Sequence, residues 1–197
     1  MSEDTGLSRR RFLAVATSVT GAVGAGFAAV PFISSWQPSA RARALGAPVE
    51  VDISKLEDGQ LMKVTWRGKP ISILRRSSGM LERMENSAVE LSDPDSEVEQ
   101  QPPYARNDMR SIKQDVLVIV SSCTHLGCVP TSRFEVAPAD LGSDWVGGFF
   151  CPCHGSKFDL AGRVFAGVPA PTNLVVPPYR YLDDNTLVIG EDAEVAA

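Results

Sequence analysis

The chain has 197 residues, enough for one domain of ordinary size and an additional segment. Hydrophobic residues make up 44% and charged residues 22% of it, which is typical of a globular protein and not of a disordered one. The formal net charge of -5 argues against a nucleic-acid-binding protein, because such a protein would normally carry a basic patch on one face.

The N-terminal segment combines a basic cluster with a long apolar run. Arg9, Arg10 and Arg11 directly precede residues 12–33, which contain no Asp, Glu, Lys or Arg. As an α-helix this run would extend roughly 33 Å, close to the bilayer core of about 30 Å. We therefore expect residues 1–11 to be a cytoplasmic N-terminus and residues 12–33 to be a single-pass transmembrane anchor.

The basic cluster also carries an export signal. Residues 8–13, Ser-Arg-Arg-Arg-Phe-Leu, resemble the twin-arginine signal, an address for proteins exported already folded around a cofactor. The alternative is an ordinary basic flank that obeys the positive-inside rule. The alanines of residues 40–44 fit a signal-peptidase site, but the apolar run is longer than a usual signal-peptide core, so we expect it to be retained. The twin-arginine interpretation and the positive-inside interpretation both leave the N-terminus in the cytoplasm and the rest of the chain outside it.

Residues 34–48 are predicted to be a hinge between the anchor and the head. They include Pro38, Gly46 and Pro48, and no helical or strand period runs through them. The composition leaves open whether this linker is flexible or helical.

Residues 49–197 are predicted to form one mainly β, mostly antiparallel head domain. Alternating or continuous apolar runs indicate strands at residues 49–53, 61–66, 71–74, 116–120, 174–176, 179–182 and 186–189. Gly68-Lys69-Pro70 and residues 183–185 are expected turns. We expect a short helix at residues 80–89 and an extended surface loop at residues 91–108.

All four cysteines and both histidines lie in two short segments. Box one is Cys-Thr-His-Leu-Gly-Cys at residues 123–128, and box two is Cys-Pro-Cys-His-Gly-Ser at residues 151–156. Thiolates suit iron–sulfur clusters, zinc and copper, and imidazole adds a nitrogen donor. Six candidate ligands are too many for one tetrahedral zinc, although a structural zinc module remains an alternative.

The two boxes resemble the signature of Rieske iron–sulfur proteins, in the form found in bacterial quinol:cytochrome c reductases. The resemblance extends over the leader, the anchor, the hinge and a Rieske-type head whose cluster-binding subdomain would be about residues 122–172. It implies one 2Fe–2S cluster, with thiolates on one iron and imidazoles on the other. The implied ligands are Cys123, Cys151, His125 and His154. The remaining cysteines, Cys128 and Cys153, would form a disulfide.

The same resemblance assigns roles to residues around the cluster. Ser156 would donate a hydrogen bond to a bridging sulfide, which raises the potential. Phe158 stands where many members have a tyrosine that donates to a cysteine sulfur, so we expect a lower potential than in those members. Pro169 would belong to the loop that covers the cluster, and Leu126 would face a quinol pocket.

The family resemblance implies an electron-transfer subunit of a respiratory enzyme that is not active alone. His154 would contact quinol and accept its proton, while the cluster takes one electron and passes it to a c-type cytochrome. Cytochrome b, the c-type cytochrome, quinol and the membrane are the implied partners, in a complex that is dimeric by analogy. The main alternative is the Rieske small subunit of an exported arsenite oxidase, which can share the leader and the disulfide.

Overall fold

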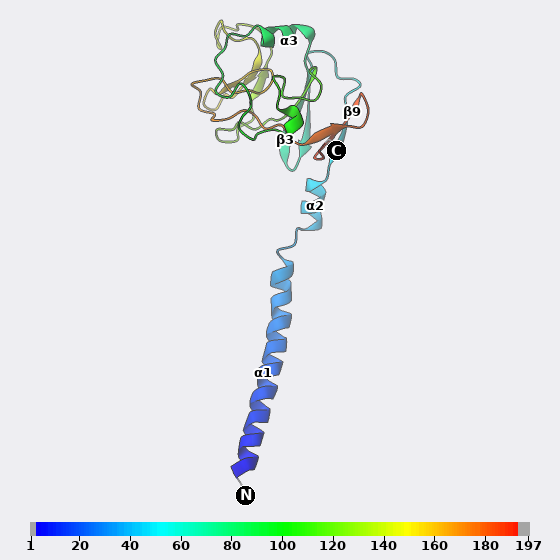
Figure 1. Ribbon diagram of the computed structural model, residues 1–197, viewed down its shortest axis with the longest axis vertical. Coiled ribbons are helices and arrows are strands. Elements are labelled where there is room, and N and C mark those ends of the chain that lie inside the picture. The colour runs from blue at the N-terminus through cyan, green and yellow to red at the C-terminus, as the bar shows by residue number, and fades with distance from the viewer. Residues whose placement is uncertain (1–2, 193–197) are drawn as a thin grey trace. The chain divides into compact units, whose positions relative to one another are not determined.

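The computed structural model describes residues 3–192. These residues divide into two compact units, 3–44 and 45–192. The first unit consists mainly of α1 (Glu3–Ser34), shown in Figure 1 as one unbroken helix. The segment Ser8–Ser34 is long and apolar enough to cross a membrane. Within its most hydrophobic stretch no residue is buried against the rest of the protein. This helix fits the predicted anchor, although length and composition alone would also suit a signal sequence.

Hydroxyl groups inside α1 are satisfied by the helix itself. Thr17 donates to the Leu13 carbonyl over 2.8 Å, and Thr20 donates to the Ala16 carbonyl over 2.9 Å. Because such bonds satisfy the hydroxyl group within the helix, it does not need a partner from the surrounding hydrocarbon. The residues are therefore compatible with an apolar surrounding despite being polar.

The predicted hinge contains a short helix, α2 (Ala40–Gly46). Ser39 begins it, with its hydroxyl accepting a hydrogen bond from the Ala42 amide, as an N-cap residue does. Of the two conformations left open for the linker, this part is helical.

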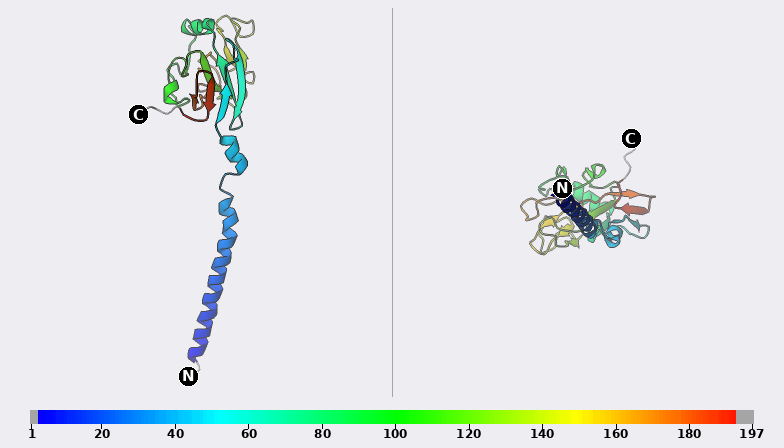
Figure 2. Two further views of the ribbon diagram at one scale, coloured as in Figure 1. Left: turned by 90° about the vertical axis from the view of Figure 1, so that its right-hand side faces the viewer. Right: turned by 90° about the horizontal axis from the view of Figure 1, so that it is seen from below.

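The head is built from three antiparallel sheets of three strands each. The first pairs β1 (Val49–Asp52), β9 (Thr186–Ile189) and β8 (Tyr179–Tyr181), and the second pairs β2 (Leu61–Trp66), β3 (Lys69–Arg75) and β4 (Val116–Val120). The third pairs β5 (Thr131–Arg133), β6 (Gly148–Phe150) and β7 (Lys157–Phe158). The left view of Figure 2 shows β1 (cyan) beside the late strands (red), so the first and last strands of the head lie together. The mainly β class is confirmed.

One hydrophobic core includes buried residues of all three sheets. All five residues of β4 are buried, as the continuous apolar run predicts for a strand covered on both faces. Its neighbour β3 buries four consecutive residues, Ile71 to Leu74. The chain thus enters box one from a fully buried strand, with two residues in between.

The β2–β3 turn begins one residue earlier and ends two residues earlier than predicted. Trp66 pairs with Lys69, so the two-residue turn is Arg67-Gly68, and Lys69 and Pro70 already belong to β3. Arg67 and Gly68 have φ values of 50° and 72°, the combination that a type I′ hairpin turn requires. The proline ring holds φ near -65°, so Pro70 is excluded from such a turn.

The helix predicted at residues 80–89 is displaced towards the N-terminus, and the loop at residues 91–108 is not a simple surface loop. Helix α3 spans Ser78–Glu85, because the Ser77 side chain caps its start by accepting from the Met80 amide. The following segment contains a 3-10 turn, η1 (Pro103–Ala105), and a buried Asp93 whose carboxylate accepts two backbone N–H groups. This segment packs into the head.

Residues 174–176 do not form the predicted strand, although Leu174 and Val176 are buried and Val175 is half-buried. The Leu174 amide donates to Gly162, the Val175 carbonyl accepts from Val120, and the Val176 amide donates to Gln100. Because these backbone groups bond to three different segments, no ladder forms. The later strands are confirmed as β8, one residue shorter than expected, and β9, and Asp183 stabilises their turn by accepting from the Asn185 amide.

We predict that Gly190→Ala destabilises the head. A Cβ at this position would lie 2.5 Å from the indole nitrogen of buried Trp66, and φ is +103°, which strains any side chain. The expected loss is about 1–3 kcal/mol of unfolding free energy, measured by thermal unfolding of the full chain in detergent.

Gly79→Ala is the matched control for this measurement. Gly79 lies in α3, its Cβ position is open, and alanine favours a helix over glycine by about 1 kcal/mol. Equal stability of the two variants would contradict the close packing of Gly190 against Trp66.

Candidate metal centre

The third sheet and β4 position the two cysteine–histidine boxes. Box one lies between β4 and β5, and box two is the six-residue loop that joins β6 to β7, whose flanking residues Phe150 and Lys157 pair. Short strands therefore fix both ends of box two. The sequence analysis did not predict β5, β6 or β7, because two or three residues are too few to show a period.

The two boxes have the same backbone hydrogen-bond pattern. In box one the Cys123 amide donates to the Cys128 carbonyl over 2.7 Å, and the Gly127 amide donates to the Cys123 carbonyl over 2.9 Å. In box two the Cys151 amide donates to Ser156 over 2.8 Å, and the Gly155 amide donates to Cys151 over 2.9 Å. Each loop therefore closes on its own first cysteine.

The glycine in each box makes this closure possible. Gly127 has a φ of 84° and Gly155 a φ of 79°, in the left-handed region that residues with a Cβ rarely adopt. Both occupy the fifth position of their box. The glycines thus set the backbone path that turns the preceding histidines towards the same end of the head.

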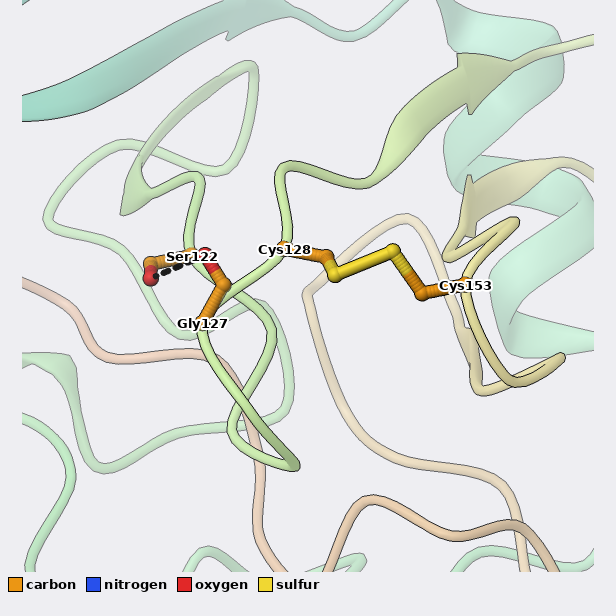
Figure 3. The surroundings of a disulfide bond; sticks show 4 residues. All are labelled: Ser122, Gly127, Cys128 and Cys153. Carbon is orange, nitrogen blue, oxygen red and sulfur yellow. Dashed lines mark hydrogen bonds between the residues drawn. A yellow bond between two sulfur atoms is a disulfide. The ribbon is translucent and has the colours of Figure 1, made fainter.

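A disulfide joins the two boxes, which confirms the pairing implied by the family resemblance. Cys128 and Cys153 are bonded across a sequence separation of 25 residues, as Figure 3 shows. In the same view the Ser122 hydroxyl donates to the Gly127 carbonyl over 3.3 Å, which ties the start of box one to its end. The two loops are therefore cross-linked directly beside their candidate ligands.

The two remaining cysteines are free thiols in the interior. Cys123 is 3% and Cys151 is 1% exposed. Burial raises the pKa of the Cys151 thiol, and the adjacent Cys123 raises it further, while N–H groups of Cys153 and His154 that donate to its sulfur act in the opposite direction. A positive metal would reverse the effect of burial and stabilise the thiolate.

The two histidines lie together at the rim of the site. The imidazole rings of His125 and His154 are 4.7 Å apart between centroids and meet edge to face. His125 is half-buried, whereas His154 is exposed. The chain thus places two buried sulfur donors and two adjacent nitrogen donors in one pair of loops.

A loop at residues 167–171 is bonded to box two, and the residue after it is bonded to box one. The Ala170 amide donates to the buried Ser156 hydroxyl over 3.0 Å, and the Thr124 hydroxyl donates to the Thr172 carbonyl over 2.7 Å. Pro169 is exposed within this loop. The sequence analysis missed Thr124 and Thr172, because a threonine between two ligand residues carries no separate signal.

The other predicted residues divide between the interior and the surface. Phe158 is fully buried on β7, and Leu126 is 71% exposed beside His125. The contact of Leu126 with a quinol stays a prediction.

The donor set fits a two-iron cluster. The Sγ atoms of Cys128, Cys151 and Cys153 lie within 4.8 Å of one another, but two of them form the disulfide and have no thiolate to offer. The available donors are two thiols and two imidazoles, the set that Rieske centres use. Among the described residues the proton of the buried Ser156 hydroxyl has no protein acceptor, so it is free to donate to a sulfide.

The family model described as Rieske [2Fe-2S] domain matches residues 48–180 of this chain. The chain belongs to the Rieske family. A second family model, described as Ubiquitinol-cytochrome C reductase Fe-S subunit TAT signal, matches residues 1–39. The Rieske cofactor is one 2Fe–2S cluster, and the assignment of its individual ligands stays a prediction.

Similar proteins agree with this membership. The chain is 63% identical to the ubiquinol-cytochrome c reductase iron-sulfur subunit of Allochromatium vinosum, over 93% of this chain and 89% of that protein. It is 44% identical to the corresponding protein of Blastochloris viridis, over 96% and 97% of the two chains. A solved chain titled Hyperthermophilic respiratory Complex III has 29% identity and a TM-score of 0.46, covering 88% of this chain and 98% of that one.

We predict that Cys128→Ser combined with Cys153→Ser weakens the Rieske head by about 3 kcal/mol, because cross-linking a loop of this length restricts the unfolded chain. The measurement is the temperature at which the cluster's visible circular dichroism is lost. The native protein treated with dithiothreitol under the same conditions is the control for reduction without substitution. An unchanged temperature in the double variant would show that the disulfide does not hold the loops together.

Proposed function

We propose that this chain is the electron-transfer subunit of a respiratory quinol:cytochrome c oxidoreductase. The observation that carries the proposal is the edge-to-face pair of His125 and His154 at the rim of two buried free thiols. The names of the similar proteins favour this function over the arsenite oxidase subunit. The chain would act only within its complex.

The proposed ligands follow from which donors are free. Cys123 and Cys151 would bind one iron as thiolates, and His125 and His154 would bind the other as imidazoles. When bound, the cluster supplies a one-electron couple whose potential in Rieske centres lies between about -150 and +300 mV. Ser156, positioned by the Ala170 amide, has its hydroxyl proton free for the cluster, and the N–H groups directed at Cys151 favour the sulfur's negative charge.

His154 is the proposed contact for quinol. Its ring is exposed, so the nitrogen that would not bind iron is open to the substrate. In its deprotonated form this nitrogen would have a lone pair, with which it would accept a hydrogen bond and then a proton from a hydroxyl group of the substrate. The exposed Leu126 adds an apolar contact beside it. The substrate pocket would be completed by cytochrome b.

The N-terminal unit supports a proposal for location and movement. Arg9, Arg10 and Arg11 lie near the N-terminal end of α1, directly before its uncharged residues, so the N-terminus would remain in the cytoplasm and the head, residues 49–197, would lie in the periplasm. Residues 34–48 would be the hinge that lets the head reach both cytochrome b and a c-type cytochrome. The complex would be a dimer anchored in the inner membrane.

Low-temperature electron paramagnetic resonance of bacterial membranes containing the protein tests the proposed ligation. After reduction with ascorbate we expect a rhombic signal whose average g lies below that of all-cysteine two-iron ferredoxins. His154→Ala should abolish this signal, because one iron would lose a ligand. Leu126→Ala, which alters the same surface without removing a ligand, is the control and should retain it.

The other outcomes distinguish the alternatives. A zinc module would give no signal with ascorbate or dithionite and would contain stoichiometric zinc. Purification with a molybdenum protein, in place of b and c cytochromes, would indicate the arsenite oxidase subunit.

We predict that Phe158→Tyr raises the midpoint potential of the cluster. The added hydroxyl would donate to a cysteine sulfur and stabilise the reduced, more negative state. Redox titration followed by circular dichroism measures the change, and Phe149→Tyr on the paired strand position is the control. A potential that stays unchanged while the protein unfolds more easily would show that the hydroxyl is buried without a partner.

A further inference from the structure

Two arginine side chains lie in the interior of the head, where charged groups are rare. Arg76 follows β3 and is 1% exposed, and Arg110 precedes β4 and is fully buried. Burying an isolated cation costs several kcal/mol unless hydrogen bonds or charges compensate it. The hydrogen bonds of these two side chains therefore indicate a role beyond packing.

Arg76 connects the central sheet to the chain that follows box two. Its Nη1 donates to the Met109 carbonyl over 2.9 Å and to the Leu160 carbonyl over 3.4 Å, and its Nη2 donates to the Ser111 hydroxyl over 2.7 Å. Leu160 lies two residues beyond the end of β7. The guanidinium thus contacts the turn into which the box-two hairpin continues.

Arg110 contacts the same turn at its next two residues. Its Nη1 donates to the carbonyls of Ala161 and Gly162 over 3.2 and 3.3 Å, and its Nη2 donates to the Gln101 side-chain oxygen over 2.8 Å. Three consecutive carbonyls, from Leu160 to Gly162, therefore accept hydrogen bonds from two buried cations.

The turn is also fixed by a buried carboxylate. Asp159 accepts from the backbone amides of Ala161 and Arg163 over 2.8 and 2.7 Å, and it forms an ion pair with Arg163. Asp159 is directly bonded to Phe158, the last residue of β7. Charged groups of Arg76, Arg110 and Asp159 thus bond to the backbone of residues 160–163, which follow β7.

The positive charge of the two arginines is only partly compensated. Neither guanidinium forms an ion pair among the side chains that the structure describes, and both Nε–H groups lack a partner there. Burial lowers the pKa of each arginine to about 10, with Asp159 acting in the opposite direction, so both remain charged at neutral pH. Fixed charges in such an interior are weakly screened by salt.

We propose that Arg76 and Arg110 are positioning residues that fix the turn behind box two and whose buried positive charge favours the reduced state of the cluster. The inference rests on the proposed function, because it requires the cluster to be bound by the two boxes. Reduction adds one negative charge to the cluster, which fixed positive charges in the weakly screened interior of the same domain stabilise. Asp159 acts with the opposite sign from the same turn.

The test is a redox titration of the assembled complex in membranes at neutral pH. Arg76→Met and Arg110→Met should each lower the midpoint potential, by a threefold to tenfold change in the ratio of reduced to oxidised cluster, where tenfold is about 59 mV for one electron. Asp159→Asn should raise it. Arg180→Met, which removes a half-buried arginine paired with Glu191, is the matched control and should leave it unchanged.

Charge-preserving variants separate electrostatics from folding. Arg76→Lys and Arg110→Lys lose the forked hydrogen bonds, so they should melt at a lower temperature while keeping a potential near that of the native protein. If the methionine variants fail to assemble, these variants and Asp159→Asn decide the question. A lowered or unchanged potential in Asp159→Asn, or methionine variants with the native potential, would overturn the inference. Absence of a Rieske signal in the native protein would instead overturn the proposed function.

Discussion

The site depends on the closure of two loops over each other. Each loop returns to its first cysteine through backbone hydrogen bonds, and one disulfide then joins the loops. Because the closing bonds use the backbone, the side chains of Cys123 and Cys151 are free to point inward and those of His125 and His154 remain at the rim. A metal held between them would have sulfur on its protected side and nitrogen on the side that partners can reach.

Polar interactions behind the loops complement this closure. The segment after β7 is surrounded by charged side chains in a region from which water is excluded, and its carbonyls are directed at Arg76 and Arg110. Apolar side chains would hold these residues at a lower cost in free energy, since buried ions lose their hydration. In exchange, hydrogen bonds specify direction, and they orient a loop that has little secondary structure of its own.

The sequence predicted the N-terminal apolar helix, the long central strands and the two boxes, because each has a strong local signal. The apolar run at residues 116–120 and the alternation of apolar and polar residues at 49–53 depend only on which faces of a strand are buried. Both segments form strands close to the expected bounds. The β2–β3 turn, residues 174–176 and the third sheet were mistaken or missed. Their conformation is set by partners distant in sequence, such as Val120 and Gly162 for residues 174–176. The disulfide required the family resemblance, since spacing alone does not pair four cysteines.

The pairing of β1 with β9 has a mechanical consequence for a tethered head. The chain enters the head at β1, whose four residues are all paired with β9, and the Leu45 carbonyl just before it accepts from the Arg67 amide. A pull along the tether is therefore resisted first by this ladder and by the β2–β3 turn. Box one and box two lie in the middle of the sequence, between β4 and β7, and carry none of that load directly. In the proposed movement of the head, a force on the tether would therefore act on β1 and not directly on the loops of the candidate metal centre.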